Sequence, residues 1–350
     1  MEEQTLEDLL KKSPMTHFSS GSKELFHSNF LYWISVTYPE VFKSIMTKLC
    51  CIKEQWPDEW WVKREYKNLD LCIIYKKDNK EYLFIVLENK VKSLPYKAQL
   101  EKYEKKIAVE DKKTCKYILL SLPKNSIREI NNWEIHHYDE LAKIMGETIK
   151  ENKIEELHLK YIEDYCIYIE NLSQLVESWK IDETSEYLAK PKLLPELRIN
   201  DLYEKLYYSQ MANMLKKRLE EENLGNKIVF GNSKISDVLS SDKIFIATTF
   251  THAQGLIEAK IKMSEESCYV IQLQGNRYCH AIETKNMTVK KFINNLFVEF
   301  ENPYIGINVL PHDKLCKYGD LFKYKYQKVE QKTIKDLLDA FVNDIKAILK

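Results

Sequence analysis

Hydrophobic residues near the N-terminus recur at helical spacing. Between residues 22 and 50, apolar side chains such as Leu25, Phe30 and Ile34 return every three or four positions, as on one face of an amphipathic helix. The preceding segment, MEEQTLEDLLKK, is acidic and amphipathic, unlike a signal peptide. We therefore expect helices in this region and no secretory leader.

Two nearly continuous apolar runs come next. Residues 69–75 and 82–90 are apolar at almost every position, and the polar turn 76–81 contains Asp and Asn, which tolerate left-handed backbone. The pattern predicts a β-hairpin with both faces covered. The aromatic and charged segment before it, residues 56–70, is expected to form a loop and an outer strand.

The rest of the first half alternates between strand-like and helix-like patterns. This order of elements favours a sheet flanked by helices. The expected elements are a helix within 96–110, strands at 115–123 and 133–138, and helices at 139–149 and 152–180.

A linker is expected at residues 181–199, which lose periodicity and contain two prolines. All six Trp residues lie before this segment, so the composition changes across it. The sequence thus predicts two domains, residues 1–184 and 185–350.

The second half is predicted to be an α+β domain that binds substrate or a partner. A helix over 200–223 precedes three strand-like segments, the last of which contains a Gly275-Asn276 turn signal. An amphipathic helix capped by Thr333 ends the chain, and it either packs within its own domain or joins two copies as a homodimer. The strand-like segments are 244–252, 255–263 and 269–283.

Composition narrows the range of functions. Lys and Arg together number 53, as do Asp and Glu, so an anionic partner must be met by a local patch rather than by net charge. The eight cysteines form no CxxC pair, which indicates reduced thiols in a cytoplasmic protein rather than zinc ligands or disulfides. The sequence contains neither a glycine-rich phosphate loop nor an apolar stretch of ~20 residues, the length of a membrane span.

Charged residues at the ends of the predicted hairpin indicate a site. Asp70 opens the first strand, and Glu88 and Lys90 end the second, although unpaired buried charge is costly. With a three-residue loop, Asp70 lies opposite Glu88 with Cβ atoms ~5 Å apart, and Lys90 shares that face. A two-residue loop puts Asp70 and Glu88 on opposite faces unless a bulge corrects the register. The interpretation therefore requires an odd loop or a bulge.

Two carboxylates and one ammonium on a single face suit phosphodiester hydrolysis. Carboxylates bind Mg²⁺, and the metal acidifies a bound water and neutralises a phosphate oxygen. Lys90 then orients or deprotonates that water, or stabilises charge in the transition state.

The same residues resemble the PD-(D/E)XK nuclease superfamily. Asp70, the hairpin and the sequence ENK at 88–90 follow its order of acid, hairpin and acid-x-Lys. Residues 23–34, KELFHSNFLYWI, are similar to the first helix of an uncharacterised bacterial branch, written HSxxLxWLL. The resemblance covers about residues 20–180. It implies an α/β, restriction-endonuclease-like core with a central mixed sheet flanked by helices.

The resemblance also implies roles for single residues. Asp70 and Glu88 hold the metal, which is Mg²⁺ with Mn²⁺ as a substitute, and Glu24 is the candidate to complete the metal shell. Gln99 and Tyr103 are similar to the QxxxY helix of several branches and share one helix face. Both are candidates to orient the substrate, although Tyr103 has the alternative of simply packing its ring.

One position departs from the family pattern. Leu69, not Pro, precedes Asp70, whereas a literal Pro-Asp pair occurs at Pro57-Asp58. We favour Asp70, because it opens the strand that pairs with the Glu88 strand.

Other polar residues have two interpretations each. His27 either assists the site or packs, and packing is the commoner role for a single histidine on a helix. Ten Lys and Arg against four acids over residues 90–124 either contact a nucleic-acid backbone or form a solvated face. Gln272, Gln274 and Arg277 share a hairpin face that either reads bases or is simply exposed.

The expected function is Mg²⁺-dependent hydrolysis of phosphodiester bonds, with DNA favoured as the substrate. The resemblance implies a role in defence against foreign DNA or in DNA repair. Two alternatives stay open: an inactive nucleic-acid-binding or protein-interaction module on the same fold, and an RNase, since no residue here decides between DNA and RNA. We expect a nucleic-acid partner, no membrane, and either a homodimer or a partner protein.

Overall fold

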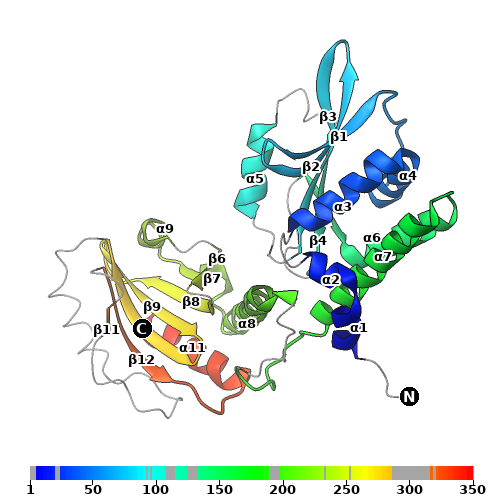
Figure 1. Cartoon of the computed structure of the whole chain (residues 1–350). Helices are drawn as coiled ribbons and strands as arrows, with labels where there is room; N and C mark the ends of the chain where they lie inside the picture. Colours follow the sequence, from blue (N-terminus) through cyan, green and yellow to red (C-terminus); the bar gives the residue numbers. More distant parts are fainter. Residues whose placement is uncertain are drawn as a thin grey trace. The chain divides into compact units, whose positions relative to one another are not determined.

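The chain divides into two compact units, which Figure 1 follows in sequence colours. One unit comprises residues 1–179 and 193–202, and the other comprises residues 180–192 and 203–350. The predicted domain boundary after residue 184 stays a prediction, and Pro191 and Pro195 of the expected linker lie outside the described residues. The computed structural model describes residues 5–19, 24–91, 94, 97–107, 115–124, 132–188, 197–231, 234–251, 254–285, 316–317 and 321–349.

The first unit is built on a five-stranded mixed sheet in the order β1-β2-β3-β4-β5. The first three strands pair antiparallel, and β4 and β5 continue the sheet in parallel with β3. Parallel strands are normally covered on both faces, which accounts for the long apolar runs. The strands are β1 (Trp60–Tyr66), β2 (Leu69–Lys77), β3 (Lys80–Lys90), β4 (Lys116–Ser121) and β5 (Trp133–His137).

Helices cover both faces of this sheet (Figure 1). On one face, Leu100 of α5 packs in a buried cluster with Cys72 of β2 and Val86 of β3. On the other, α3 contacts β1, β2 and β3. The predicted α/β core with a mixed sheet and flanking helices is thus confirmed. The helices are α1 (Leu6–Lys12), α2 (Pro14–Ser19), α3 (Glu24–Thr37), α4 (Pro39–Leu49), α5 (Lys97–Lys106), α6 (Tyr138–Lys150) and α7 (Glu156–Glu177).

The helical pattern expected over residues 22–50 is confirmed and is divided into two helices, α3 and α4. Pro39 occupies the first position of α4, where its missing N–H costs nothing, but inside a continuous helix it would remove a hydrogen bond. The apolar spacing continues across the break between Thr37 and Pro39, so the hydrophobic pattern alone did not indicate it. Tyr138, expected in a strand, instead opens α6.

The second unit holds a seven-stranded sheet in the order β11-β12-β10-β9-β8-β7-β6, antiparallel except for the β6–β7 pair. The Gly275-Asn276 turn is confirmed, since Gln274 pairs with Arg277 across it. The strands are β6 (Ile228–Phe230), β7 (Ile244–Thr251), β8 (Gln254–Lys262), β9 (Ser267–Gln274), β10 (Arg277–Thr284), β11 (Cys316–Lys317) and β12 (Phe322–Lys328).

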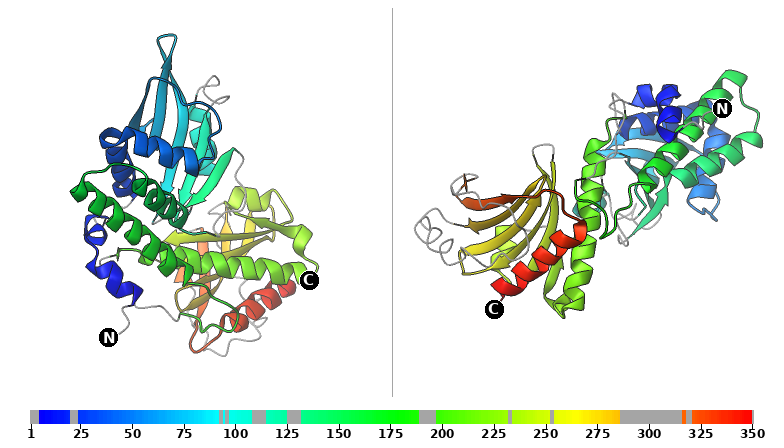
Figure 2. Two further views of the ribbon diagram at one scale, coloured as in Figure 1. Left: turned by 90° about the vertical axis from the view of Figure 1, so that its right-hand side faces the viewer. Right: turned by 90° about the horizontal axis from the view of Figure 1, so that it is seen from below.

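Helices α8 (Asn200–Glu221), α9 (Ile235–Leu239) and α11 (Ile334–Ile348) accompany this sheet. Figure 2 shows α11 lying along one face of the curved sheet. Thr333 and Asp336 form the predicted capping box, and Leu337, Phe341 and Ile345 are fully buried. The apolar stripe of α11 therefore packs within its own unit. No helix in the described ranges is long and apolar enough to cross a membrane.

Candidate active site

The β2–β3 hairpin combines a two-residue turn with a bulge. Lys77 pairs with Lys80, and the turn residues Asp78 and Asn79 have left-handed φ values of 49° and 58°. The register shifts by one residue at Ile73/Ile74, because Phe84 has no partner across the ladder. The odd loop is therefore absent from this hairpin, and the bulge that a two-residue turn requires is present.

The bulge places Asp70 and Glu88 side by side. Beyond it, Cys72 pairs with Val86 and Leu71 with Leu87, so the next pair in register is Asp70 with Glu88. Side chains alternate along a strand, so these two acids share the face on which Cys72 and Val86 pack against α5.

Lys90 completes a buried ionic group on this face. Its Nζ donates to Glu88 Oε1 at 2.8 Å, and Glu24 Oε2 lies 3.9 Å away, at the first residue of α3. The side chains of Glu88 and Lys90 are 2% and 6% exposed, whereas that of Glu24 is 27% exposed. Glu24 thus borders the group from the solvent side.

Asn89, between the two charged residues, fixes the strand end. Its N–H donates to Asp70 Oδ2 at 2.7 Å. Its side chain lies on the opposite face, where Nδ2 donates to Ser28 Oγ of α3 at 2.7 Å and Oδ1 accepts from the Tyr138 hydroxyl of α6 at 2.8 Å. Three elements therefore hold the position of Asp70. Ser28 belongs to the HSxxL pattern and Asn89 to the ENK sequence, but the sequence had indicated no role for these two residues or for Tyr138.

This geometry agrees with a comparison of the sequence with protein families. The chain matches the PD-(D/E)XK nuclease superfamily over residues 44–167. The resemblance predicted from the sequence is therefore confirmed for this segment, which contains Asp70, Glu88 and Lys90 but not Glu24. No curated protein and no solved structure matches the chain. Nucleases of this superfamily typically use divalent metals and act on nucleic acids, so the match supports a nuclease-type function.

The electrostatics of the acid–lysine group favour an added cation. Burial raises the pKa of Glu88 to about 7, and the neighbouring Asp70 charge adds to the rise. Burial also raises the pKa of Asp70, against the Asn89 hydrogen bond and the charge of Lys90. Burial lowers the pKa of Lys90, but Glu88 and Glu24 more than compensate and leave it above its ordinary value. Lys90 therefore keeps its proton. Its one positive charge does not offset the burial of both Asp70 and Glu88, since their pKa values stay raised.

Asp70 and Glu88 offer two carboxylates to a divalent cation. Glu88 Oε2 is buried and has no hydrogen-bond partner within the described residues. In that same part of the chain, no three His, Cys, Asp or Glu side chains are close enough to hold a metal together. Mg²⁺ is commonly bound by one or two carboxylates with waters and substrate oxygens. Glu24 as a third ligand stays a prediction.

Gln99 and Tyr103 lie together on α5, with Gln99 Nε2 2.6 Å from the Tyr103 hydroxyl. Burial raises the pKa of Tyr103, and the charge of Glu88 contributes, which places this ring near the acids. Of the lysines that follow the site, Lys92, Lys112 and Lys113 lie outside the described residues.

Asp58 lies apart from the acid–lysine group, and His27 packs against tyrosines of α6 and α7. Asp58 borders a cavity of about 790 Å³ with Tyr75 and Lys77, at the end of β2 remote from Asp70. His27 is fully buried, and its Nδ1 lies 2.9 Å from the Tyr165 hydroxyl, as expected for a packing residue.

Proposed function

We propose that this chain is a Mg²⁺-dependent nuclease that hydrolyses phosphodiester bonds, with DNA as the favoured substrate. The observation that carries the proposal is the bulge-aligned group of Asp70, Glu88 and Lys90, with a buried carboxylate oxygen of Glu88 left for a cation. The resemblance to a bacterial branch supports a role in defence against foreign DNA or in DNA repair.

Asp70 and Glu88 would hold the metal. When bound, it acidifies a water and offsets negative charge on the phosphate. Lys90 retains its proton, so its Nζ acts as a hydrogen-bond donor and positive charge toward the attacking water or a phosphate oxygen, not as the base. The Asn89 N–H keeps Asp70 in place throughout.

The test is a cleavage assay on plasmid, linear duplex, single-stranded DNA and RNA, with Mg²⁺, Mn²⁺ or EDTA. We expect metal-dependent cutting by the wild type and by Lys80→Ala, a charge control at the far turn of the hairpin. Glu88→Gln and Lys90→Ala should not cut. Cutting that survives both substitutions would disprove the assigned site. Nucleic-acid binding without cutting on every substrate would instead identify an inactive binding module.

A further inference from the structure

Five side chains meet at the outer edge of the sheet, on the face that carries Asp70 and Glu88. We refer to them as the β1 edge strip. Three come from β1 and the turn after it, and two come from α5. The β1 edge strip consists of Lys63, Tyr66, Lys67, Tyr103 and Lys106.

Cations and aromatic rings alternate within the β1 edge strip. The ammonium groups of Lys63 and Lys67 each lie 5.2 Å from the centre of the Tyr66 ring. Lys106 Nζ lies 5.7 Å from the Tyr103 ring centre and donates to the main-chain oxygen of Lys67 at 3.5 Å. Lys63 also pairs with Glu81 at 2.9 Å, so Lys67 and Lys106 supply most of the uncompensated charge.

The β1 edge strip is continuous with the acid–lysine group. Tyr66 pairs with Leu69, the neighbour of Asp70, and packs on the same buried cluster as Tyr103. Tyr103 in turn lies close enough for the charge of Glu88 to raise its pKa after burial.

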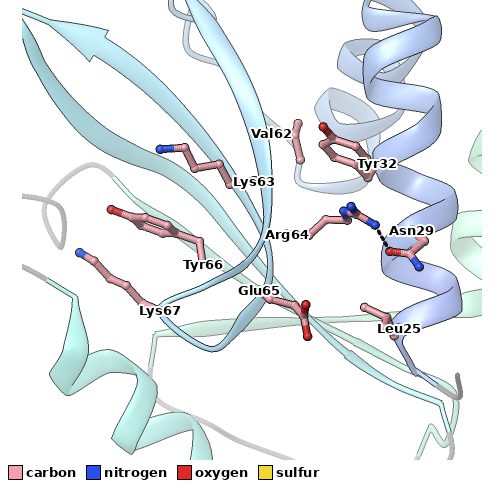
Figure 3. Close-up of a pocket in the computed structure, with 9 residues that line it drawn as sticks. All are labelled: Leu25, Asn29, Tyr32, Val62, Lys63, Arg64, Glu65, Tyr66 and Lys67. Atoms are coloured by element: carbon pink, nitrogen blue, oxygen red, sulfur yellow. Dashed lines mark hydrogen bonds between the residues drawn. The ribbon is translucent and has the colours of Figure 1, made fainter.

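A hollow of about 500 Å³ is lined by α3 and by β1, which is the edge strand of the described sheet. Of the β1 edge strip, Lys63, Tyr66 and Lys67 line this hollow. Figure 3 shows Lys63, Tyr66 and Lys67 pointing to one side of the strand and Arg64 to the other, toward α3. Arg64 stacks on Tyr32 with its guanidinium carbon 4.6 Å from the ring centre, and it donates to Asn29. The volume lies in the range of ligand pockets, ~300–1,000 Å³.

This chemistry suits an unpaired nucleic-acid strand. Proteins that bind single strands combine a basic groove for the phosphates with aromatic rings on which bases stack. The acids of the site repel the phosphates of a nucleic acid, so cationic side chains beside the site are needed to offset this repulsion. Resting on the proposed nuclease function, we propose that the β1 edge strip binds an unpaired strand leading to the site, with a base on Tyr66 and phosphates on Lys67 and Lys106.

The test measures binding in EDTA, where metal-dependent cleavage is off, by fluorescence anisotropy. The probes are labelled oligothymidine of about 12 nucleotides, the matching oligouridine, and a duplex of equal length. Tyr66→Leu keeps apolar packing but removes the ring, and it should weaken single-strand binding about tenfold, whereas Tyr66→Phe should not. Lys67→Ala should lower the salt dependence of log K by about 0.7, and Lys80→Ala should leave it unchanged. Circular dichroism checks that each variant is folded.

Equal single-strand affinity of Tyr66→Leu and Tyr66→Phe would overturn the inference, as would tighter binding of the duplex with no effect of Tyr66→Leu. Thymidine monophosphate that binds as tightly as the oligonucleotide would make the site a free-nucleotide pocket and also overturn it. If the wild type cleaves and Tyr66→Leu binds single strands as tightly as the wild type, the nuclease function is supported and the strand-binding inference is wrong. If binding depends on the Tyr66 ring but nothing is cleaved, the strand-binding inference is supported and the nuclease function is wrong.

Discussion

Among the residues that the structure describes, two Glu-x-Lys sequences are buried, one in each unit. Glu88 and Lys90 end β3, and Glu258 and Lys260 lie in the middle of β8. In both, the lysine reaches its own glutamate and one more: Lys90 lies 2.8 Å from Glu88 and 3.9 Å from Glu24. Lys260 lies 3.5 Å from Glu258 and 2.7 Å from Glu283.

The two motifs differ in what surrounds the glutamate. In register, Glu258 faces Ala247 on one side and Gln272 on the other, so the residues directly opposite it are not acidic. Glu88 has Asp70 beside it and a buried oxygen with no hydrogen-bond partner in the described structure. The local sequence alone therefore does not indicate a metal site. The proposed site also depends on a second acid, Asp70, that lies alongside Glu88 at the end of the strand.

The largest expected effect is on catalysis. Glu88→Gln should reduce cleavage by about a thousandfold, since it removes a charge on which transition-state stabilisation depends, while Glu258→Gln should leave the rate within a factor of two. Single-turnover cleavage at saturating Mg²⁺ measures both. Equal losses in the two variants would mean that the motifs do not differ in function.

The second effect concerns stability. Lys260→Ala leaves Glu258 and Glu283 without their shared cation in a largely buried site, and it should lower the free energy of unfolding by about 3 kcal/mol. Urea denaturation with a second-unit probe would measure this loss. Cleavage per folded molecule should not change, and a drop in it would assign the second motif a catalytic role.

The third effect is a pH dependence of stability that arises from Glu88. Glu88 has a pKa of about 7 in the folded protein against an ordinary value of 4.5, so the folded state binds the proton more tightly. Its contribution to the unfolding free energy is complete below pH 4.5 and is lost as the pH rises through 7. Without metal, we expect the wild type to lose about 2–3 kcal/mol over this range.

Glu88→Gln should reduce this loss to the part that the raised pKa of Asp70 contributes, and added Mg²⁺ should also reduce it because the ion stabilises the carboxylates. Urea titrations at several pH values, in EDTA and in Mg²⁺, make the comparison. Identical pH profiles of wild type and Glu88→Gln would refute the assignment.

The smallest expected effect is a difference in cleavage rate between Phe variants of two buried tyrosines, Tyr138 and Tyr278. Tyr138→Phe leaves Asn89 Oδ1 without its donor and should cost about 1–2 kcal/mol, together with a several-fold lower cleavage rate, because Asn89 positions Asp70. Tyr278→Phe removes a comparable bond to Asp344, at 2.7 Å, and should cost similar stability without slowing cleavage. Thermal melts paired with rates of folded enzyme distinguish the two.

The sequence indicated the hairpin and its charged ends, because buried strands and their interruptions leave a direct pattern. The mixed sheet was implied by the family resemblance and not by that pattern. The sequence could not locate the bulge, since Phe84 is as apolar as its neighbours and only the pairing reveals it. Nor could it mark Asn89, whose role depends on Ser28 and Tyr138, residues remote in the chain. Tyr66 and Lys67 were missed for the same reason: their meeting with α5 is a matter of tertiary structure.

The bulge at Phe84 also makes the site depend on whether an odd or an even number of residues separates Asp70 from Glu88. Deleting Phe84 would turn Glu88 and Lys90 toward α3 and bring Asn89 to their face, with every catalytic residue still encoded. A compensating glycine between Asp78 and Asn79 would restore the parity. A single insertion or deletion in this hairpin should therefore disrupt the proposed site, whereas one insertion combined with one deletion should be tolerated. The number of residues between Asp70 and Glu88 is thus as strongly constrained as their identity.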